Sequence, residues 1–414
     1  MELKPGYKQT EVGVIPQDWV VRPLSSISLK IMVGIASAAT HAYRLSGIPM
    51  IRNQNIKPGH LLDSDLLFID QEYEKTYRNK RLLEGDLLTT RTGYPGTTCI
   101  VPAKYKAAQS FTTLITRPDT AQITSKFLCL YINSEHGQRF FESSQIGGAQ
   151  KNVNTGTLKK MPIPIPTVSE QTKVSNVLGA VEELLASIEN LIAKKRALQQ
   201  AAMQVLLTGK RRLPGFEGEW EVKRLGDVGE IKSGGTPSTS QRAFWDGGVP
   251  WCTPTDITAL DGRKYLTTTA RNISPSGLQA SSAEMIPPQS LIMTTRATIG
   301  ECAINTLPIT TNQGFKNIVP SPVIGTEFLY YLMSTQKQRL ISLCGGSTFL
   351  EIGKKELSAY EIRLPLERAE QDAISSTLSA IDDELQALEA SLRKAEDLKQ
   401  GMMQQLLTGK IRLA

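Results

Sequence analysis

The sequence has little of what membrane, exported and metal-binding proteins need. No uninterrupted apolar run in its 414 residues approaches the roughly 20 residues of a membrane helix, and the N-terminus lacks the basic-then-apolar pattern of an export signal. Its five cysteines include no Cys-x-x-Cys pair, and its three histidines share no local ligand spacing. We therefore expect a cytoplasmic chain that has neither a disulfide framework nor a metal site.

Motifs for catalysis are also absent. The sequence contains no Gly-x-x-x-x-Gly-Lys-Ser/Thr phosphate loop, no Gly-x-Gly-x-x-Gly after a strand and no serine nucleophile elbow. It also lacks the Asn/Asp-Pro-Pro-Tyr/Phe motif with which an amino-methyltransferase holds its target amine. We expect neither a catalytic residue nor a bound cofactor in this chain.

What the chain does have is an ordinary globular composition, 40% hydrophobic and 21% charged. Its length predicts two to three domains with ample cores. The net charge of +7 is compatible with nucleic-acid binding but is weak evidence by itself. The excess of positive charge lies in the first 213 residues.

An internal repeat organises the chain. Residues 170–213 and 370–413 align without a gap, and 19 of their 44 positions are identical. The segments before them match more loosely, through Trp19 and Trp220 and through a Thr-Thr-Arg triplet at 89–91 and 294–296. The chain is therefore built as variable–repeat–variable–repeat, in two halves of about 200 residues each.

Each repeat predicts a long helix. Apolar residues recur at alternating spacings of four and three, which is the seam of a coiled coil. These positions are Val174, Leu178, Val181, Leu185, Ile188 and Ile192 in the first copy, and Ile374, Leu378, Ile381, Leu385, Leu388 and Leu392 in the second. Thr-Gly at 208–209 and 408–409 supplies a glycine stop. A helix over 170–208 would be roughly 58 Å long at 1.5 Å per residue.

So narrow an apolar stripe needs a partner helix, and the simplest partner is the other copy. The charges of +3 for 169–213 and −3 for 369–414 favour this pairing, and the chain order predicts that the two helices are antiparallel. The alternatives are that each helix packs on its own domain, or that it mediates a homodimer.

The variable segments are predicted to be mixed α/β domains. Candidate strands are 87–90, 113–116, 291–295 and 317–320, and a proline-marked strand leads into each helix. The predicted fold is two α/β recognition domains separated by two long antiparallel helices that form a coiled coil, with an internal pseudo-two-fold repeat. Its segments are 1–168 (first domain), 169–213 (first helix), 214–368 (second domain) and 369–414 (second helix).

Several motifs follow one another along the chain, and some of them are repeated in the second half. They include Gly-Val-Ile-Pro-x-x-Trp at 13–19, Gly-Gly-Ala-Gln-Lys-Asn at 147–152, the Glu-Gln entry into each helix and the Leu-Leu-Thr-Gly-Lys end. With them the whole chain resembles the specificity (S) subunit of type I restriction–modification systems. The second half departs from the pattern at 345–349, where Gly-Gly-Ser-Thr-Phe replaces the Gln-Lys-Asn element.

The resemblance implies a non-catalytic subunit whose two target-recognition domains each bind one half of a bipartite, asymmetric site in double-stranded DNA. It implies two methyltransferase (M) subunits as partners, which use S-adenosylmethionine to methylate adenine N6. Restriction (R) subunits would add an ATP- and Mg-dependent nuclease. These cofactors belong to the partner chains, and none is expected in this one.

The residues independently point the same way. Two similar but non-identical domains held apart by a rod should read two different short sequences at a fixed spacing. A symmetric dimer obtains such a spacing from its symmetry, whereas here the site need not be palindromic. The alternative is a coiled-coil scaffold that carries two protein-binding domains.

Candidate DNA-binding residues come from comparing the two halves, because shared positions suit structure or phosphate contact and differing polar loops suit base contact. Arg52, Asn53, Gln54 and Asn55 can pair with guanine or adenine, or else serve as turn residues. Arg91 and Arg296, each after a threonine (Thr90 and Thr295), would clamp a phosphate, read guanine or tie a loop to its own domain. The remaining candidates are Tyr94, Gln150, Lys151 and Asn152 in the first half, and Thr253, Thr255 and Gln313 in the second.

Four of these candidates have structural alternatives as well. Gln150, Lys151 and Asn152 could instead begin a helix capped by Asn154. Tyr94 could stack on a base or sugar, or merely cover its turn. Trp19 and Trp220 are expected in the core.

Overall fold

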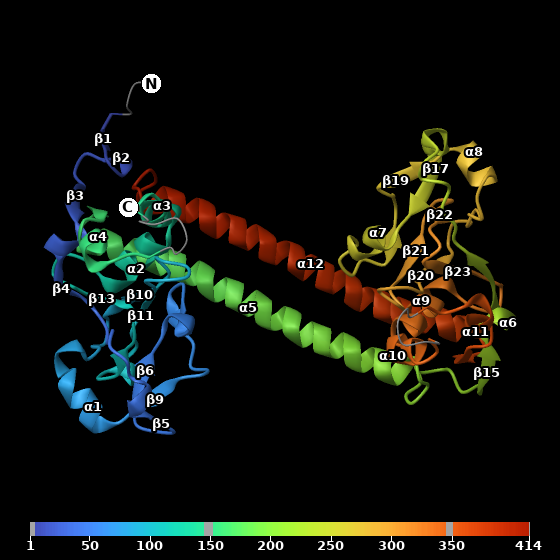
Figure 1. The fold of residues 1–414 in the computed structure, drawn as a ribbon, viewed down its shortest axis with the longest axis horizontal. Helices are drawn as coiled ribbons and strands as arrows, with labels where there is room; N and C mark the ends of the chain where they lie inside the picture. Colours follow the sequence, from blue (N-terminus) through green and yellow to red (C-terminus); the bar gives the residue numbers. More distant parts are fainter. Residues whose placement is uncertain (1–4, 145–151, 345–350, 414) are drawn as a thin grey trace. The chain divides into compact units, whose positions relative to one another are not determined.

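The computed structural model describes residues 5–144, 152–344 and 351–413. The chain divides into two compact units (Figure 1), the first comprising Met1–Glu189 and Ser391–Ala414 and the second Asn190–Ala390. The boundary falls inside both long helices, α5 (Val168–Leu206) and α12 (Arg368–Leu406). Each unit therefore contains one globular domain and half of each helix.

The central sheets of the two units share one topology. In the first unit the order is β4-β13-β10-β11, formed by Ser28–Val33, Leu114–Pro118, Leu87–Thr89 and Thr98–Ile100. In the second it is β16-β23-β20-β21, formed by Gly229–Ser233, Phe315–Pro320, Leu291–Thr294 and Cys302–Asn305, and extended by β18 (Tyr265–Leu266). The four shared strands are antiparallel to their neighbours in both units. The predicted duplication of a mixed α/β domain is confirmed.

A smaller sheet is also repeated. In the first unit β6 (Ile48–Ile51) lies between β12 (Gln109–Ser110), which is parallel to it, and β9 (Leu67–Ile69), which is antiparallel and leads to β5 (Tyr43–Arg44). In the second unit β17 (Trp245–Cys252) lies in the same way between β22 (Thr310–Thr311) and β19 (Arg271–Ile273). The strand pairs therefore give a residue-by-residue correspondence between the domains.

Short helices follow the same repeat. Corresponding pairs are α2 (Ser125–Asn133) with α9 (Thr326–Ser334), α3 (Glu135–Ser143) with α10 (Lys337–Ile341), and α4 (Thr155–Lys159) with α11 (Lys354–Ser358). The proline-marked strands β14 (Pro162–Ile165) and β24 (Glu361–Pro365) pair with β3 (Val20–Pro23) and β15 (Trp220–Arg224) before each long helix begins. Asn154 caps α4 by accepting a hydrogen bond from Thr157 N at 2.9 Å, as the sequence predicts.

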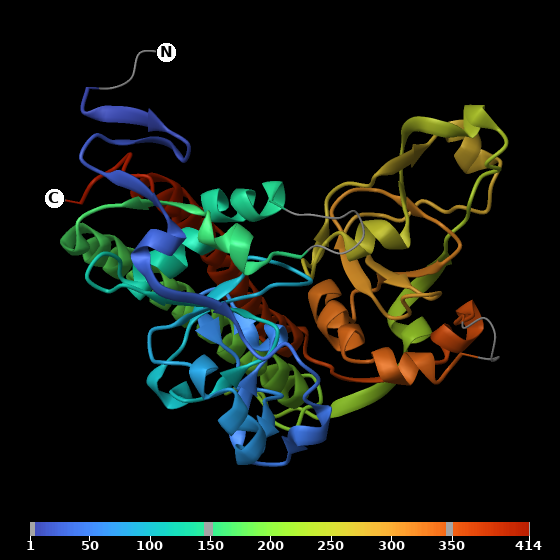
Figure 2. The same ribbon diagram turned by 60° about the vertical axis from the view of Figure 1, so that its left-hand side comes forward.

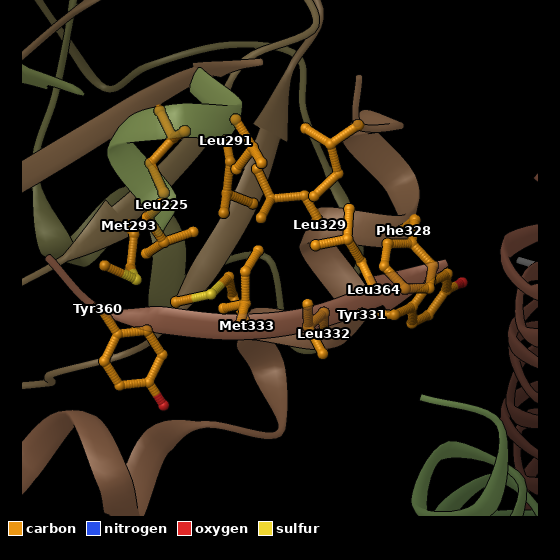
Figure 3. Close-up of a cluster of buried hydrophobic side chains, with 14 of the residues drawn as sticks. Leu225, Leu291, Met293, Phe328, Leu329, Tyr331, Leu332, Met333, Tyr360 and Leu364 are labelled. Atoms are coloured by element: carbon orange, nitrogen blue, oxygen red, sulfur yellow. The ribbon is translucent and has the colours of Figure 1, made fainter. Parts of the chain in front are cut away.

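The main core of the second unit lies between the central sheet and α9. Leu291 and Met293 of β20, Leu225 of α6 (Leu225–Val228) and the α9 side chains Leu329 and Met333 face one interior (Figure 3). The corresponding core of the first unit gathers β10, α2 and the start of α5. Trp19 and Trp220 are both buried, as predicted.

The long helices pair through the predicted seam. None of its twelve apolar side chains is exposed. In the first unit Lys399 of α12 forms an ion pair with Glu182 of α5 at 2.9 Å. In the second, Arg196 of α5 pairs with Glu389 of α12 at 2.7 Å, and Lys195 pairs with Glu384. Glu182, early in α5, pairs with Lys399, late in α12, whereas the later Lys195 and Arg196 pair with the earlier Glu384 and Glu389. The two copies therefore pair as antiparallel helices.

Both helices end as the sequence predicts. Gly209 and Gly409 have φ values of +69° and +67°, a left-handed conformation that glycine adopts without strain. Beyond α12 the chain meets the N-terminal hairpin of β1 (Tyr7–Thr10) and β2 (Gly13–Pro16) (Figure 2). There Tyr7 Oη donates to Gly409 O at 3.1 Å. Within the described ranges, no helix combines the length and apolarity that crossing a membrane requires.

Candidate nucleic-acid interface

In the first domain, three of the predicted segments meet. Asn53 Nδ2 donates to Thr92 Oγ1 at 3.0 Å, which joins the 52–55 loop to the loop after β10. Arg91 Nε donates to Asn152 Oδ1 at 3.1 Å, and Thr92 and Asn152 form an isolated antiparallel bridge. Residues spread over 100 positions of sequence thus form one polar surface.

The four residues of the 52–55 loop divide into two kinds. Asn55 is 1% exposed, and its amide accepts from Arg52 N at 3.0 Å and donates to Ser64 O at 2.9 Å. It holds the loop, which supports the turn interpretation for this one residue. Gln54 is exposed, and Arg52 is half-buried with Nη2 donating to Asp65 O.

Two atoms of this loop have unsatisfied hydrogen-bonding capacity. Arg52 Nε and Asn53 Oδ1 are buried and have no hydrogen-bond partner among the described residues. Buried polar groups are rarely left unpaired in folded proteins, and the exceptions often mark a functional site. A base edge, which carries both donors and acceptors, would offer both groups a partner, whereas a phosphate would partner only Arg52 Nε.

The loop after β10 presents one aromatic side chain. Thr90 is buried and its hydroxyl donates to Tyr94 O, which fixes the turn and leaves Tyr94 87% exposed. Thr90 therefore acts on the loop, and Tyr94 faces outward. Gln150 and Lys151 lie outside the described residues.

In the second domain the corresponding loop follows β17. Thr253 donates to Asp256 Oδ2 through both N and Oγ1 at 2.7 Å, and Asp256 Oδ1 accepts from Ala270 N at 2.8 Å. Asp256 thus holds this loop as Asn55 holds that of the first domain. Thr255, in the first turn of α7 (Pro254–Thr258), is exposed.

The other candidates of the second domain lie on adjacent loops. Thr295 is fully buried, with Oγ1 donating to Gly314 O at 3.2 Å, so it supports the backbone. Gln313 is exposed and accepts a hydrogen bond from Thr236 Oγ1. Arg296 forms an ion pair with Glu351 at 2.7 Å, and its Nε is buried without a partner in the described part of the chain.

Comparison of the arginines reveals a charge exchange between the domains. Leu88 pairs with Ile115 in the first domain, and Met293 pairs with Lys316 at the same place in the second. Lys316 is 7% exposed and lies 3.7 Å from Glu351. The first domain therefore has an isoleucine in the sheet and Asn152 beside its arginine, where the second has a lysine and a glutamate.

Burial of Lys316 lowers the pKa of its ammonium, and the charge of Glu351 partly offsets this effect. The buried ammonium depends on this carboxylate, because a buried charge without a counter-ion is costly, whereas Glu351 also pairs with Arg296. No sequence pattern indicated this pair, since the exchange becomes visible only when the strands are placed in register. No group of three or more potential metal ligands occurs among the residues that the structure describes.

Comparison with known proteins agrees with this architecture. The family model "Type I restriction modification DNA specificity domain" matches residues 16–195 and 217–396. A putative type I restriction enzyme specificity subunit of Methanocaldococcus jannaschii, MjaX, is 26% identical over 98% of this chain and 97% of its own length. The MjaIX specificity subunit of the same organism is 39% identical over 167 residues, which are 40% of this chain and 38% of that protein.

A solved structure supports the fold. It comes from work on complex assembly and conformational transition of the type I R-M system, and it aligns over 96% of this chain and 99% of its own with a TM-score of 0.61. Its sequence is 18% identical to this one, so this likeness concerns the fold alone.

Proposed function

Since the chain belongs to the family of type I restriction–modification specificity subunits, we propose that each recognition domain binds one half of a bipartite, asymmetric site in double-stranded DNA. The observation that carries this proposal is the convergence of Asn53, Thr92, Arg91 and Asn152 on one surface of the first domain. That surface combines guanidinium and amide groups, which are the side chains that pair with guanine and adenine in the major groove.

Within this surface we assign separate tasks. Arg52, Asn53 and Gln54 differ from the residues at the same place in the second domain, and they are the candidates for base contact. Arg91 and Arg296 are shared, and they suit phosphate contact. Asn55, Thr90 and Thr295 hold the loops, because their side chains are buried and hydrogen-bonded within the domain.

The partners of the proposal are two methyltransferase subunits, with restriction subunits added in a nuclease complex. Members of this family are non-catalytic and act in a complex with other subunits. S-adenosylmethionine, ATP and Mg would be bound by those partner chains in the cytoplasm, where adenine N6 in the recognised site is methylated. The antiparallel helix pair would serve as the spacer that sets the distance between the half-sites.

Sequencing of methylated adenine in the host genome, with and without the gene for this chain, tests the proposal. The expected result is the loss of one interrupted, asymmetric methylated motif. If the methylome is unchanged while the gene is expressed, the DNA-reading role is wrong. Copurification of the chain with proteins unrelated to methylation would then favour a coiled-coil scaffold.

A further inference from the structure

The two domains differ in where they carry an arginine beside the recognition loop. Met50 pairs with Leu67 on one side and Gln109 on the other, and Trp251 pairs with Arg271 and Thr310 in the same way. Two residues after these strand positions come Arg52 and Thr253. The first domain therefore has arginine in the loop and leucine on the neighbouring strand, whereas the second has threonine in the loop and Arg271 on the strand.

Arg271 is held by two tryptophans. Its guanidinium carbon lies 4.0 Å from the ring centroid of Trp245 and 5.2 Å from that of Trp251. The two indoles pack edge to face, with centroids 4.9 Å apart and planes at 85°. Trp251 is 4% exposed and donates from Nε1 to Gly235 O at 2.9 Å, so the platform is anchored in the domain.

A bulge in β17 lets Trp245 reach this position. Trp245 and Val249 both face Ile273, so residues 246–248 are looped out of the strand pair. Asp246 has a φ of +57°, and a Cβ on Gly247 would lie 2.4 Å from Ser274 Cα. A larger side chain at Gly247 would block this turn. Because the turn loops out of the strand pair, Trp245 lies opposite the same strand that carries Arg271.

The outer side of Arg271 is free. Its side chain is exposed and makes no hydrogen bond or ion pair to any residue in the described ranges. Asp256 ties the backbone at Ala270 to the loop that carries Thr253 and Thr255. The guanidinium is thus fixed next to the recognition loop with its donors unused.

We propose that Arg271 is a specificity-determining residue of the second domain and that it reads a guanine in the second half-site. This inference rests on the proposed function. Stacking on Trp245 restrains the plane of the guanidinium, so that its fork of N–H donors is presented in one orientation, and such a fork matches O6 and N7 of guanine. A phosphate also accepts such a fork, but the arginine stands at a position that differs between the two domains, which suits base contact better than phosphate contact. Trp245 is the positioning residue for Arg271.

The test uses the full chain assembled with its methyltransferase partner. Base preferences are measured on two pools of DNA, each with one of the two half-sites randomised. Arg271→Ala should lower the preference for guanine at one position of one half-site by roughly 10- to 100-fold, and leave the other half-site unchanged. Arg271→Lys should lose most of the same preference, because lysine keeps the charge but not the fork. Trp245→Leu should reduce the preference in part while binding to unrelated DNA stays constant.

Arg339→Ala is the matched control, since Arg339 is an exposed arginine of the same unit that belongs to α10 and not to the recognition loop. Its guanidinium carbon lies 5.2 Å from the ring centroid of Tyr360, so it too contacts an aromatic ring. Preferences should be unchanged in this variant. If Arg271→Ala instead weakens DNA binding equally on every sequence, and the dependence of log affinity on log salt concentration falls by about one, Arg271 contacts a phosphate. That result would overturn the inference. So would unaltered preferences. A wild-type complex that reads neither half-site would overturn the proposed function itself.

Discussion

Arg412 donates two hydrogen bonds to the carboxylate of Glu170, 242 residues earlier, from Nε at 2.9 Å and from Nη2 at 2.8 Å. Trp19 Nε1 donates to the same carboxylate at 3.2 Å. In the second unit Arg212 and Trp220 hold Glu370 in the same way. Each helix therefore begins with a glutamate bound by an arginine that follows the other helix. This cross-connection gives the repeated Glu-Gln and Lys-x-Arg-Leu motifs a structural role.

Loss of this contact should weaken the first unit. Glu170 is 7% exposed, so Arg412→Ala leaves a nearly buried carboxylate with the Trp19 indole as its remaining partner. We expect a loss of about 1–2 kcal/mol in the free energy of unfolding, reduced from the fully buried case because the Arg412 side chain is 42% exposed. Urea-induced unfolding of the wild type and the variant measures this difference in free energy. Lys410→Ala, at an exposed position two residues earlier, should have little effect, and an equal loss in both variants would contradict the role of the pair.

The charge exchange at Lys316 predicts a strong coupling. Glu351→Asn should destabilise the protein by about 2 kcal/mol, because it leaves the Lys316 ammonium buried without its carboxylate. The double variant Lys316→Ile, Glu351→Asn reproduces the arrangement of the first domain, so most of the loss should be recovered. Glu356→Gln, at a nearby exposed position, serves as the control. Additive losses in the double variant would exclude the coupling.

The pKa of Lys316 predicts a pH dependence of stability. Burial holds the folded-state pKa below its usual value, so the folded chain releases this proton at a lower pH than the unfolded chain does. Between the two pKa values the unfolded chain binds more protons, and stability rises with pH. Lys316→Met should remove this component while Arg296 still pairs with Glu351. Unfolding free energies from pH 7.5 to pH 10 should then rise more for wild type than for the variant; parallel curves would show that Lys316 is not the cause.

Base contacts by the first domain predict an asymmetric loss of specificity. Arg52→Ala and Gln54→Ala should relax methylation at one half-site only, by roughly 5- to 100-fold at one base pair each. Glu84→Ala changes a residue outside these loops and should alter neither half-site. If both variants instead weaken DNA binding equally on all sequences, the two side chains contact the phosphate backbone and not the bases.

The helix pair predicts the spacer of the DNA site. The ion pairs Glu182–Lys399 and Lys195–Glu384 flank one stretch of each helix, 187–193 in α5 and 388–394 in α12. Deleting either stretch removes one heptad from its helix without changing the phase of the seam. Deleting both should shorten the spacer by about three base pairs, since seven helical residues span roughly 10 Å and one base pair about 3.4 Å. Methylome sequencing would reveal the new motif, and deletion from one helix alone should abolish methylation. An unchanged spacer would contradict the role of the helices as a ruler.

The sequence by itself determined the duplication, the two long helices and their ends. Heptad spacing and a glycine stop are local patterns, so the position and the end of each helix can be predicted without knowing the distant residues on which it packs. The same holds for Asn154 as a helix cap and for the burial of Trp19 and Trp220. Sequence patterns also singled out Arg91 and Asn152 as candidates, although they did not show that the two residues are in contact.

Only the tertiary structure decided which polar side chains face outward and which hold the fold. Asn55 and Gln54 are neighbours in one loop, yet Asn55 is buried and donates a hydrogen bond to Ser64 O, whereas Gln54 is exposed. Arg271 lies near the loop of Thr253 because β17 and β19 pair in register. The bulge in β17 in turn places the Trp245 ring against the Arg271 guanidinium. The role of a polar residue depends on partners that are distant in sequence, and no local pattern encodes those partners.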